Sequence, residues 1–167
     1  WRDNPLQIAQ KYLQWAADYQ ENQITIIYDT MWDGTRMLAE HIAKGIKQKD
    51  DKVTVKLYNI ARTDINDVVT EVFKSKAILL GSPTINKGIL NAMAALMDMV
   101  AGLKFKNKKA AAFGCYGWSG ESVKILNEHL SKAGFEVLGE GFKALWQPGD
   151  EALGQALEFG KDFAGKL

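Results

Sequence analysis

The chain has 167 residues, of which 47% are hydrophobic, and a formal net charge of +1 at pH 7. This length and composition predict one globular domain with a sizeable core. A charge so close to zero argues against nucleic-acid and membrane-surface partners, since both need a basic field. Cys115 is the single cysteine, so no intrachain disulfide is possible. Together with the lack of a transmembrane-length apolar run or a signal peptide, this leads us to expect a cytoplasmic protein.

The first segment of the chain resembles a connection rather than part of the main fold. The chain begins with Trp1 instead of Met, and we expect a neighbouring domain to precede it in a longer protein. Asn4-Pro5 is typical of a helix start, with Asn as the cap and Pro at the first helical position. Apolar residues at helical spacing then predict a helix over 5–19. We therefore divide the chain into a lead-in or linker helix (1–21) and a main domain (22–167).

From Gln23 onward, short apolar strands alternate with helices of ten or more residues, which predicts βαβ units and an α/β fold with a parallel sheet. Right-handed crossovers place helices on both faces of the sheet. A five-stranded order of 2-1-3-4-5 puts the ligand site outside the carboxyl ends of the strands, at the loops after the first, third and fourth strands. The expected strands are 23–28, 53–58, 77–81, 109–114 and 135–138, the last resuming near 142–146, and the expected helices are 35–47, 64–73, 90–100, 121–133 and 151–167.

The loop after the first strand has the composition of an anion site. Backbone N–H groups at a helix N-terminus bind anions, and the hydroxyls at both ends of this loop can add hydrogen bonds. The loop contains no lysine or arginine, so a phosphate would be held mainly by neutral donors and the helix dipole. An ordinary helix cap is the alternative interpretation. The candidate residues are Thr30, Met31, Trp32, Asp33, Gly34 and Thr35.

Two later loops would face the first one at the same edge of the sheet. The loop after the third strand offers hydroxyl and amide groups to a planar polar ligand, unless it is a plain turn. The loop after the fourth strand interleaves glycines with large aromatic rings, which a flat aromatic ligand would cover unless they fold back onto the core. The candidates are Ser82, Pro83, Thr84, Ile85, Asn86 and Lys87 in one loop, and Gly114, Cys115, Tyr116, Gly117, Trp118, Ser119 and Gly120 in the other.

The three loops together resemble those of flavodoxins, and more closely the flavodoxin-like domain of flavodiiron proteins in the anaerobic nitric oxide reductase flavorubredoxin branch. This resemblance implies a flavodoxin-like three-layer sandwich that binds FMN. It places the FMN phosphate in loop 30–35, the ribityl chain beside loop 82–87 and the isoalloxazine along loop 114–120. The matching segments are Tyr28-Asp29-Thr30-Met31 with Thr35, Gly81-Ser82-Pro83-Thr84-Ile85-Asn86, and Phe113 to Gly120.

The resemblance also implies an electron-transfer role. Such a domain relays electrons from a rubredoxin domain or an NADH-dependent reductase to a non-haem diiron site. That site lies in a metallo-β-lactamase-like domain of the parent chain or of its dimer mate. The parent would be an oxidoreductase acting on nitric oxide or dioxygen, whereas this chain alone would hold and cycle the flavin, with no catalytic or metal-binding residues, as a monomer.

Two residues in the phosphate loop depart from the small polar side chains that are common in flavodoxins. A carboxylate beside a phosphate is unfavourable unless it points away and caps the helix, so we expect Asp33 to point outward. Trp32 has two open placements, over the edge of the flavin or on the surface.

Other functions fit the sequence less well. A cysteine-dependent phosphatase would need an arginine six residues after Cys115, where Glu121 stands. A receiver-type signalling module would need an aspartate at the end of the third strand, which instead ends in Gly81-Ser82. Neither a P-loop nor a G-x-G-x-x-G pattern is present. A flavin-free interaction domain remains the alternative from a different class.

Overall fold

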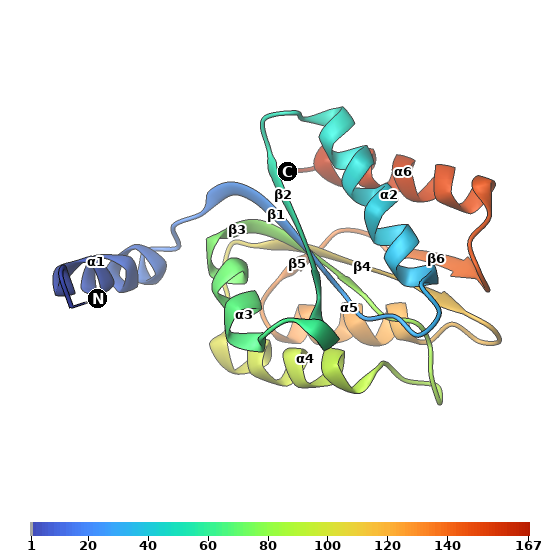
Figure 1. Cartoon of the computed structure of the whole chain (residues 1–167), viewed down its shortest axis with the longest axis horizontal. Coiled ribbons are helices and arrows are strands. Elements are labelled where there is room, and N and C mark those ends of the chain that lie inside the picture. The colour runs from blue at the N-terminus through green and yellow to red at the C-terminus, as the bar shows by residue number, and fades with distance from the viewer. Residues whose placement is uncertain (1) are drawn as a thin grey trace.

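The computed structural model describes residues 2–167. Its main body has three layers, with a parallel sheet between two layers of helices (Figure 1). The sheet order is β2-β1-β3-β4-β5, as predicted, and β6 also pairs with β4. The strands are β1 (Glu21–Tyr28), β2 (Thr54–Asn59), β3 (Ser75–Gly81), β4 (Lys109–Tyr116), β5 (Glu136–Val137) and β6 (Phe142–Leu145). The helices are α1 (Pro5–Ala16), α2 (Gly34–Lys49), α3 (Ile65–Lys74), α4 (Asn91–Leu103), α5 (Ser122–Lys132) and α6 (Asp150–Ala164), with a 3-10 turn at Ile60–Arg62.

The sheet separates two hydrophobic cores. Successive strand side chains point to opposite faces, so Ile26 packs with the α2 and α6 side whereas Ile27 packs with the α3, α4 and α5 side. Strand β1 is buried along almost its whole length because both of its faces are covered. This double coverage holds the carboxyl ends of the central strands in fixed positions.

The fifth position of the sheet is shared by two short strands. β5 pairs with Lys109–Ala110 near the start of β4, and β6 pairs with Phe113–Tyr116 near its end. The expected strand therefore does resume after an interruption. As a result, the end of β6 lies level with the end of β4, and the loop that follows β6 reaches the same edge of the sheet as the three loops described above.

Helix α1 stands apart from the three layers and projects from the amino ends of the strands (Figure 1). None of its residues is buried, and its Trp15 ring stacks on Phe73, with ring centroids 5.0 Å apart. The expectation of a helix to residue 19 was too long, because Asp18 takes a left-handed conformation (φ 55°) and the helix ends at Ala16. The last helix likewise ends at Ala164 and not at 167.

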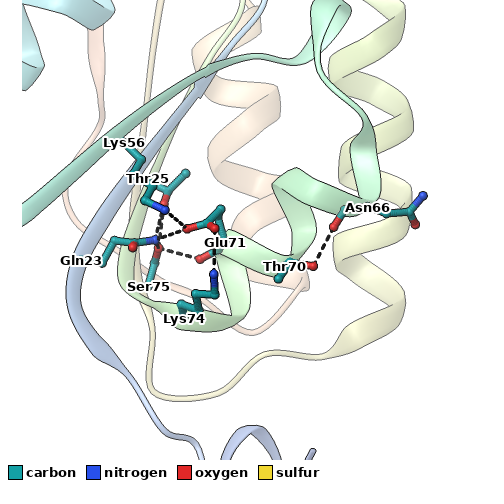
Figure 2. Close-up of polar contacts among 8 residues, drawn as sticks. All are labelled: Gln23, Thr25, Lys56, Asn66, Thr70, Glu71, Lys74 and Ser75. Carbon is teal, nitrogen blue, oxygen red and sulfur yellow. Dashed lines mark hydrogen bonds and ion pairs between the residues drawn. The ribbon is translucent and has the colours of Figure 1, made fainter. Parts of the chain in front are cut away.

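A buried polar cluster joins β1, β2, α3 and β3 near the amino ends of the strands (Figure 2). We call it the Glu71 cluster; its members are Gln23, Thr25, Lys56, Glu71, Lys74 and Ser75. The Glu71 carboxylate pairs with the ammonium groups of Lys56 and Lys74, each at 2.9 Å, and accepts a 2.8 Å hydrogen bond from Gln23. Burial disfavours this charge, but the bonds from Lys74, Lys56 and Gln23 outweigh it and hold the pKa of Glu71 below its ordinary value.

Candidate functional site

A cavity of about 400 Å³ lies at the carboxyl ends of the strands, at the point where the strand order reverses. Its size falls within the roughly 300–1,000 Å³ that is usual for cofactor and small-molecule sites. Loops after β1, β3, β4 and β6 form its walls. The lining residues are Thr30, Met31, Trp32, Gly34, Thr35, Pro83, Thr84, Cys115, Tyr116, Gly117, Trp118, Trp146 and Gln147.

One end of the cavity carries hydrogen-bonding groups that have no partner within residues 2–167. The hydroxyls of Thr30 and Thr35 are buried and form no hydrogen bond with these residues, although Thr35 lies beside the thiol of Cys115. No side chain caps the N-terminus of α2, which opens directly onto this end at Gly34. A Cβ at Gly34 would lie only 3.0 Å from Cys115 Sγ, so a larger residue would close the space. Unpaired donors at a helix N-terminus are suited to an anion.

Asp33 points away from the cavity, as the unfavourable carboxylate–phosphate contact led us to expect, but it does not cap α2. Its backbone is left-handed (φ 61°) and its side chain makes no capping hydrogen bond. The carboxylate instead accepts a 3.0 Å hydrogen bond from Arg36 Nε, which lowers the pKa of Asp33. Arg36 also pairs with Glu40 at 2.8 Å, so two carboxylates already neutralise the cation nearest the loop.

The loop after β3 contributes less to the cavity than the sequence suggested. Pro83 and Thr84 line it, and the Thr84 backbone N–H fixes the loop by donating to the Cys115 carbonyl at 2.9 Å. Ser82 is fully buried, and its hydroxyl donates to the Pro83 carbonyl and accepts from the Leu90 N–H, so it stabilises the loop. The predicted residues that do not line the cavity here are Ser82, Ile85, Asn86 and Lys87, the last three lying in a tight turn closed by Ile85 and Gly88.

The other end of the cavity is aromatic. Tyr116, Gly117 and Trp118 line it, whereas Gly114, Ser119 and Gly120 do not. Trp118 is 90% exposed, and Trp32 on the facing loop is 83% exposed while also lining the cavity. The alternative in which the aromatic rings fold back onto the core is therefore wrong for Trp118.

The fourth wall of the cavity is absent from the residues predicted for the site. Trp146 and Gln147 follow β6 and line the cavity, whereas the predicted site residues end at Gly120. The signal was present in the sequence, because Trp146-Gln147-Pro148-Gly149 follows a resumed strand in the fifth position of the sheet. A loop in that position must emerge at the same edge as the others.

Cys115 lines the cavity as a neutral thiol. Burial raises its pKa to about 11. Since the thiolate is the reactive form, this thiol is a poor nucleophile. Within residues 2–167, no three or more His, Cys, Asp or Glu side chains gather where they could hold a metal ion. None of the helices over this same range is both long and apolar enough to span a membrane.

The parallel sheet is doubly wound and has a cavity at its switch point. The cavity has unpaired anion donors at one end and exposed aromatic rings at the other. These features define a cofactor domain of the flavodoxin type. The flavodoxin family model matches residues 26–160, and the chain belongs to the flavodoxin family. FMN is the cofactor of this family. The structure fits that cofactor, because the cavity has two buried, unpartnered hydroxyls at one end and aromatic side chains at the other.

Known proteins share this sequence and fold over nearly the whole chain. The chain is 50% identical to an anaerobic nitric oxide reductase flavorubredoxin from Klebsiella pneumoniae, over 98% of the chain and 34% of the relative. The rubredoxin oxygen:oxidoreductase of Desulfovibrio gigas superposes with a TM-score of 0.88 and 32% identity, over 98% of the chain and 40% of that structure. Oxidised flavodoxin 1 from Bacillus cereus matches with a TM-score of 0.77 and 27% identity, over 87% and 99% respectively. The chain thus spans about a third of the length of its curated relatives.

Proposed function

We propose that this chain binds one FMN in the cavity and serves as an electron-transfer domain. The observation that carries this proposal is the pair of buried hydroxyls, Thr30 and Thr35, left without partners at the uncapped N-terminus of α2. A buried hydroxyl without a partner costs about 1–3 kcal/mol. Such a cost is removed when a ligand oxygen takes the missing hydrogen bonds.

The phosphate end would act through neutral groups. The hydroxyls of Thr30 and Thr35 and the first N–H groups of α2 would surround the phosphate oxygens, helped by the helix dipole. The Arg36 guanidinium is already paired with the carboxylates of Asp33 and Glu40. Because no free cation takes part, we expect the affinity for FMN to depend only weakly on salt concentration.

The aromatic end would hold the isoalloxazine ring. FMN supplies the electron-carrying chemistry, and the protein supplies binding, orientation and electrostatics. Tyr116 and Trp118 would lie against the ring, and Trp32 stands at the same opening. Contact with these rings should stabilise the oxidised flavin most and so lower its potential.

In the longer protein, we propose that this domain passes electrons to a non-haem diiron site in a metallo-β-lactamase-like domain of the same chain or a dimer mate. A rubredoxin domain or an NADH-dependent reductase would supply the electrons, in the cytoplasm. The support comes from the relatives, which include a flavorubredoxin, a rubredoxin oxygen:oxidoreductase and the flavodiiron protein of Giardia intestinalis. The whole protein would then reduce nitric oxide or dioxygen.

The decisive experiment is a visible absorption spectrum of the purified chain, followed by release and mass identification of the chromophore. We expect flavin bands and released FMN, and calorimetry of the stripped protein should show tighter binding of FMN than of riboflavin, which lacks the phosphate. Trp118→Ala should weaken FMN binding and shift its potential. A colourless protein that takes up no added FMN would overturn the proposal and favour a flavin-free interaction domain.

A further inference from the structure

The loop after β6 connects the two ends of the cavity. At the phosphate end, Gln147 Nε2 contacts Met37 Sδ on α2 at 3.2 Å, and a Cβ at Gly34 would lie 3.2 Å from Pro148 Cδ. At the aromatic end, the Trp146 N–H donates to the Tyr116 carbonyl at 2.8 Å. A single short loop therefore contacts both the start of α2 and the end of β4.

Trp146 occupies an unusual backbone conformation within this loop. Its φ is +54°, in the left-handed region, where bulky side chains are disfavoured. The other non-glycine residues with positive φ in the described chain are Asp, Asn or Lys, so Trp146 is the one aromatic residue among them. Strained residues of this kind persist where the surroundings hold them, and they concentrate at functional sites.

The Trp146 side chain gains little burial in return for this conformation. The residue is 62% exposed, so core packing does not explain it. Its ring instead lies over the backbone of Gly117, where an added Cβ would come within 3.3 Å of it. It also stands beside Trp118, with ring centroids 6.0 Å apart and planes at 57°. The ring thus lies against Gly117 and beside Trp118, both of which line the aromatic end of the cavity.

We propose that Trp146 is a positioning residue of the flavin site, kept in its left-handed conformation because this places its ring against Gly117 and Trp118. The ring would limit the orientations open to Trp118 and so preset the aromatic wall before the ligand enters. Glycine at position 117 allows this close approach, since a Cβ there would require the Trp146 ring to shift by a few tenths of an ångström. This inference rests on the proposed FMN function and adds to it a residue that acts through Trp118.

The test compares three variants in the stripped protein and after loading with FMN. Trp146→Gly removes the ring while allowing the left-handed backbone. Trp146→Phe keeps an aromatic ring. Lys104→Gly is the matched control, since Lys104 is also left-handed (φ 49°) but lies at the end of α4, outside the cavity lining. The measurements are the melting temperature of the apoprotein, the FMN dissociation constant by calorimetry and the midpoint potential of the bound flavin.

We expect Trp146→Gly to weaken FMN binding at least tenfold and to move its potential, while the apoprotein melts no lower than the wild type, as for Lys104→Gly. Trp146→Phe should restore the affinity to within about threefold and return the potential. Wild-type binding that survives unchanged in Trp146→Gly overturns this inference and leaves the proposed function intact. So does a clear fall in the apoprotein melting temperature of Trp146→Gly, because the ring would then be structural. Absence of FMN binding by the wild type would instead overturn the proposed function itself.

Discussion

Two buried hydroxyls at the amino ends of the strands are hydrogen-bonded, whereas two at the carboxyl ends are unpaired within the described chain. Near the amino ends, Thr25 and Ser75 bond to each other at 2.8 Å, and each accepts a hydrogen bond from Gln23. At the carboxyl ends, the hydroxyls of Thr30 and Thr35 are also shielded from water and have no hydrogen-bond partner in the described part of the chain. A satisfied buried group helps to define the fold, whereas an unsatisfied one costs about 1–3 kcal/mol. The comparison indicates that the edge at the amino ends is organised for stability and the edge at the carboxyl ends for a ligand.

The largest effect on stability should come from a substitution in the Glu71 cluster. Glu71→Ala removes the acceptor for Lys56, Lys74 and Gln23 and should lower the free energy of unfolding by about 1.5–3 kcal/mol, the range for hydrogen bonds to a charged group. Urea unfolding of the apoprotein measures this loss. FMN affinity should stay the same, because the cluster lies at the opposite edge from the cavity; a parallel loss of affinity would show that the two ends are coupled.

A matched pair of threonine variants sharpens the comparison. Thr25→Val breaks bonds to Gln23 and Ser75 and should cost about 1–2 kcal/mol of stability with unchanged FMN affinity. Thr35→Val deletes an unpaired hydroxyl, so the apoprotein should be no less stable, yet FMN should bind about tenfold more weakly, which corresponds to about 1.4 kcal/mol. Urea unfolding and calorimetry on both variants provide the check. If both variants lost stability, or if both lost FMN affinity, the assignment of the amino ends to stability and the carboxyl ends to ligand binding would be contradicted.

The smallest effect is a difference in acid sensitivity. Burial opposes the Glu71 charge, but bonds from Lys74, Lys56 and Gln23 prevail and lower its folded-state pKa from the ordinary value of 4.5. A group with a lowered pKa contributes its full stability above pH 4.5 and loses it as the pH falls through the folded-state value. Unfolding free energies measured from pH 6 to pH 3 should therefore fall more steeply for the wild type than for Glu71→Gln. Equal slopes of unfolding free energy against pH would show that Glu71 does not cause the acid sensitivity.

Much of the fold follows from local patterns that the sequence displays openly. The alternation of strands and helices, the order 2-1-3-4-5 and three of the four loops around the cavity could be predicted. These features depend on periodicity and on the rule that ligands bind at the switch point. The flavodoxin resemblance then supplied the cofactor, which periodicity alone could not.

The misses depended on three-dimensional context. Trp146 reaches the cavity because β6 pairs with the end of β4; the sequence indicates the resumed strand but does not specify this register. Ser82 has the right chemistry for a ligand contact, but the fold turns its hydroxyl toward the backbone of its own loop. Asp33 has the right chemistry for a cap, but Arg36 one turn later binds its carboxylate instead.

The distribution of indole rings gives the molecule an optical consequence. Of the five tryptophans in the chain, Trp32, Trp118 and Trp146 line the cavity, whereas Trp15 is stacked on Phe73 at the opposite end. A flavin in the cavity would absorb the excitation energy of the three nearby indoles, whose exposed rings emit at the red side of the spectrum. Trp15, at the opposite end of the molecule, would be quenched less. The intrinsic emission of the protein should therefore fall as the cavity fills, so that occupancy can be followed without any added label.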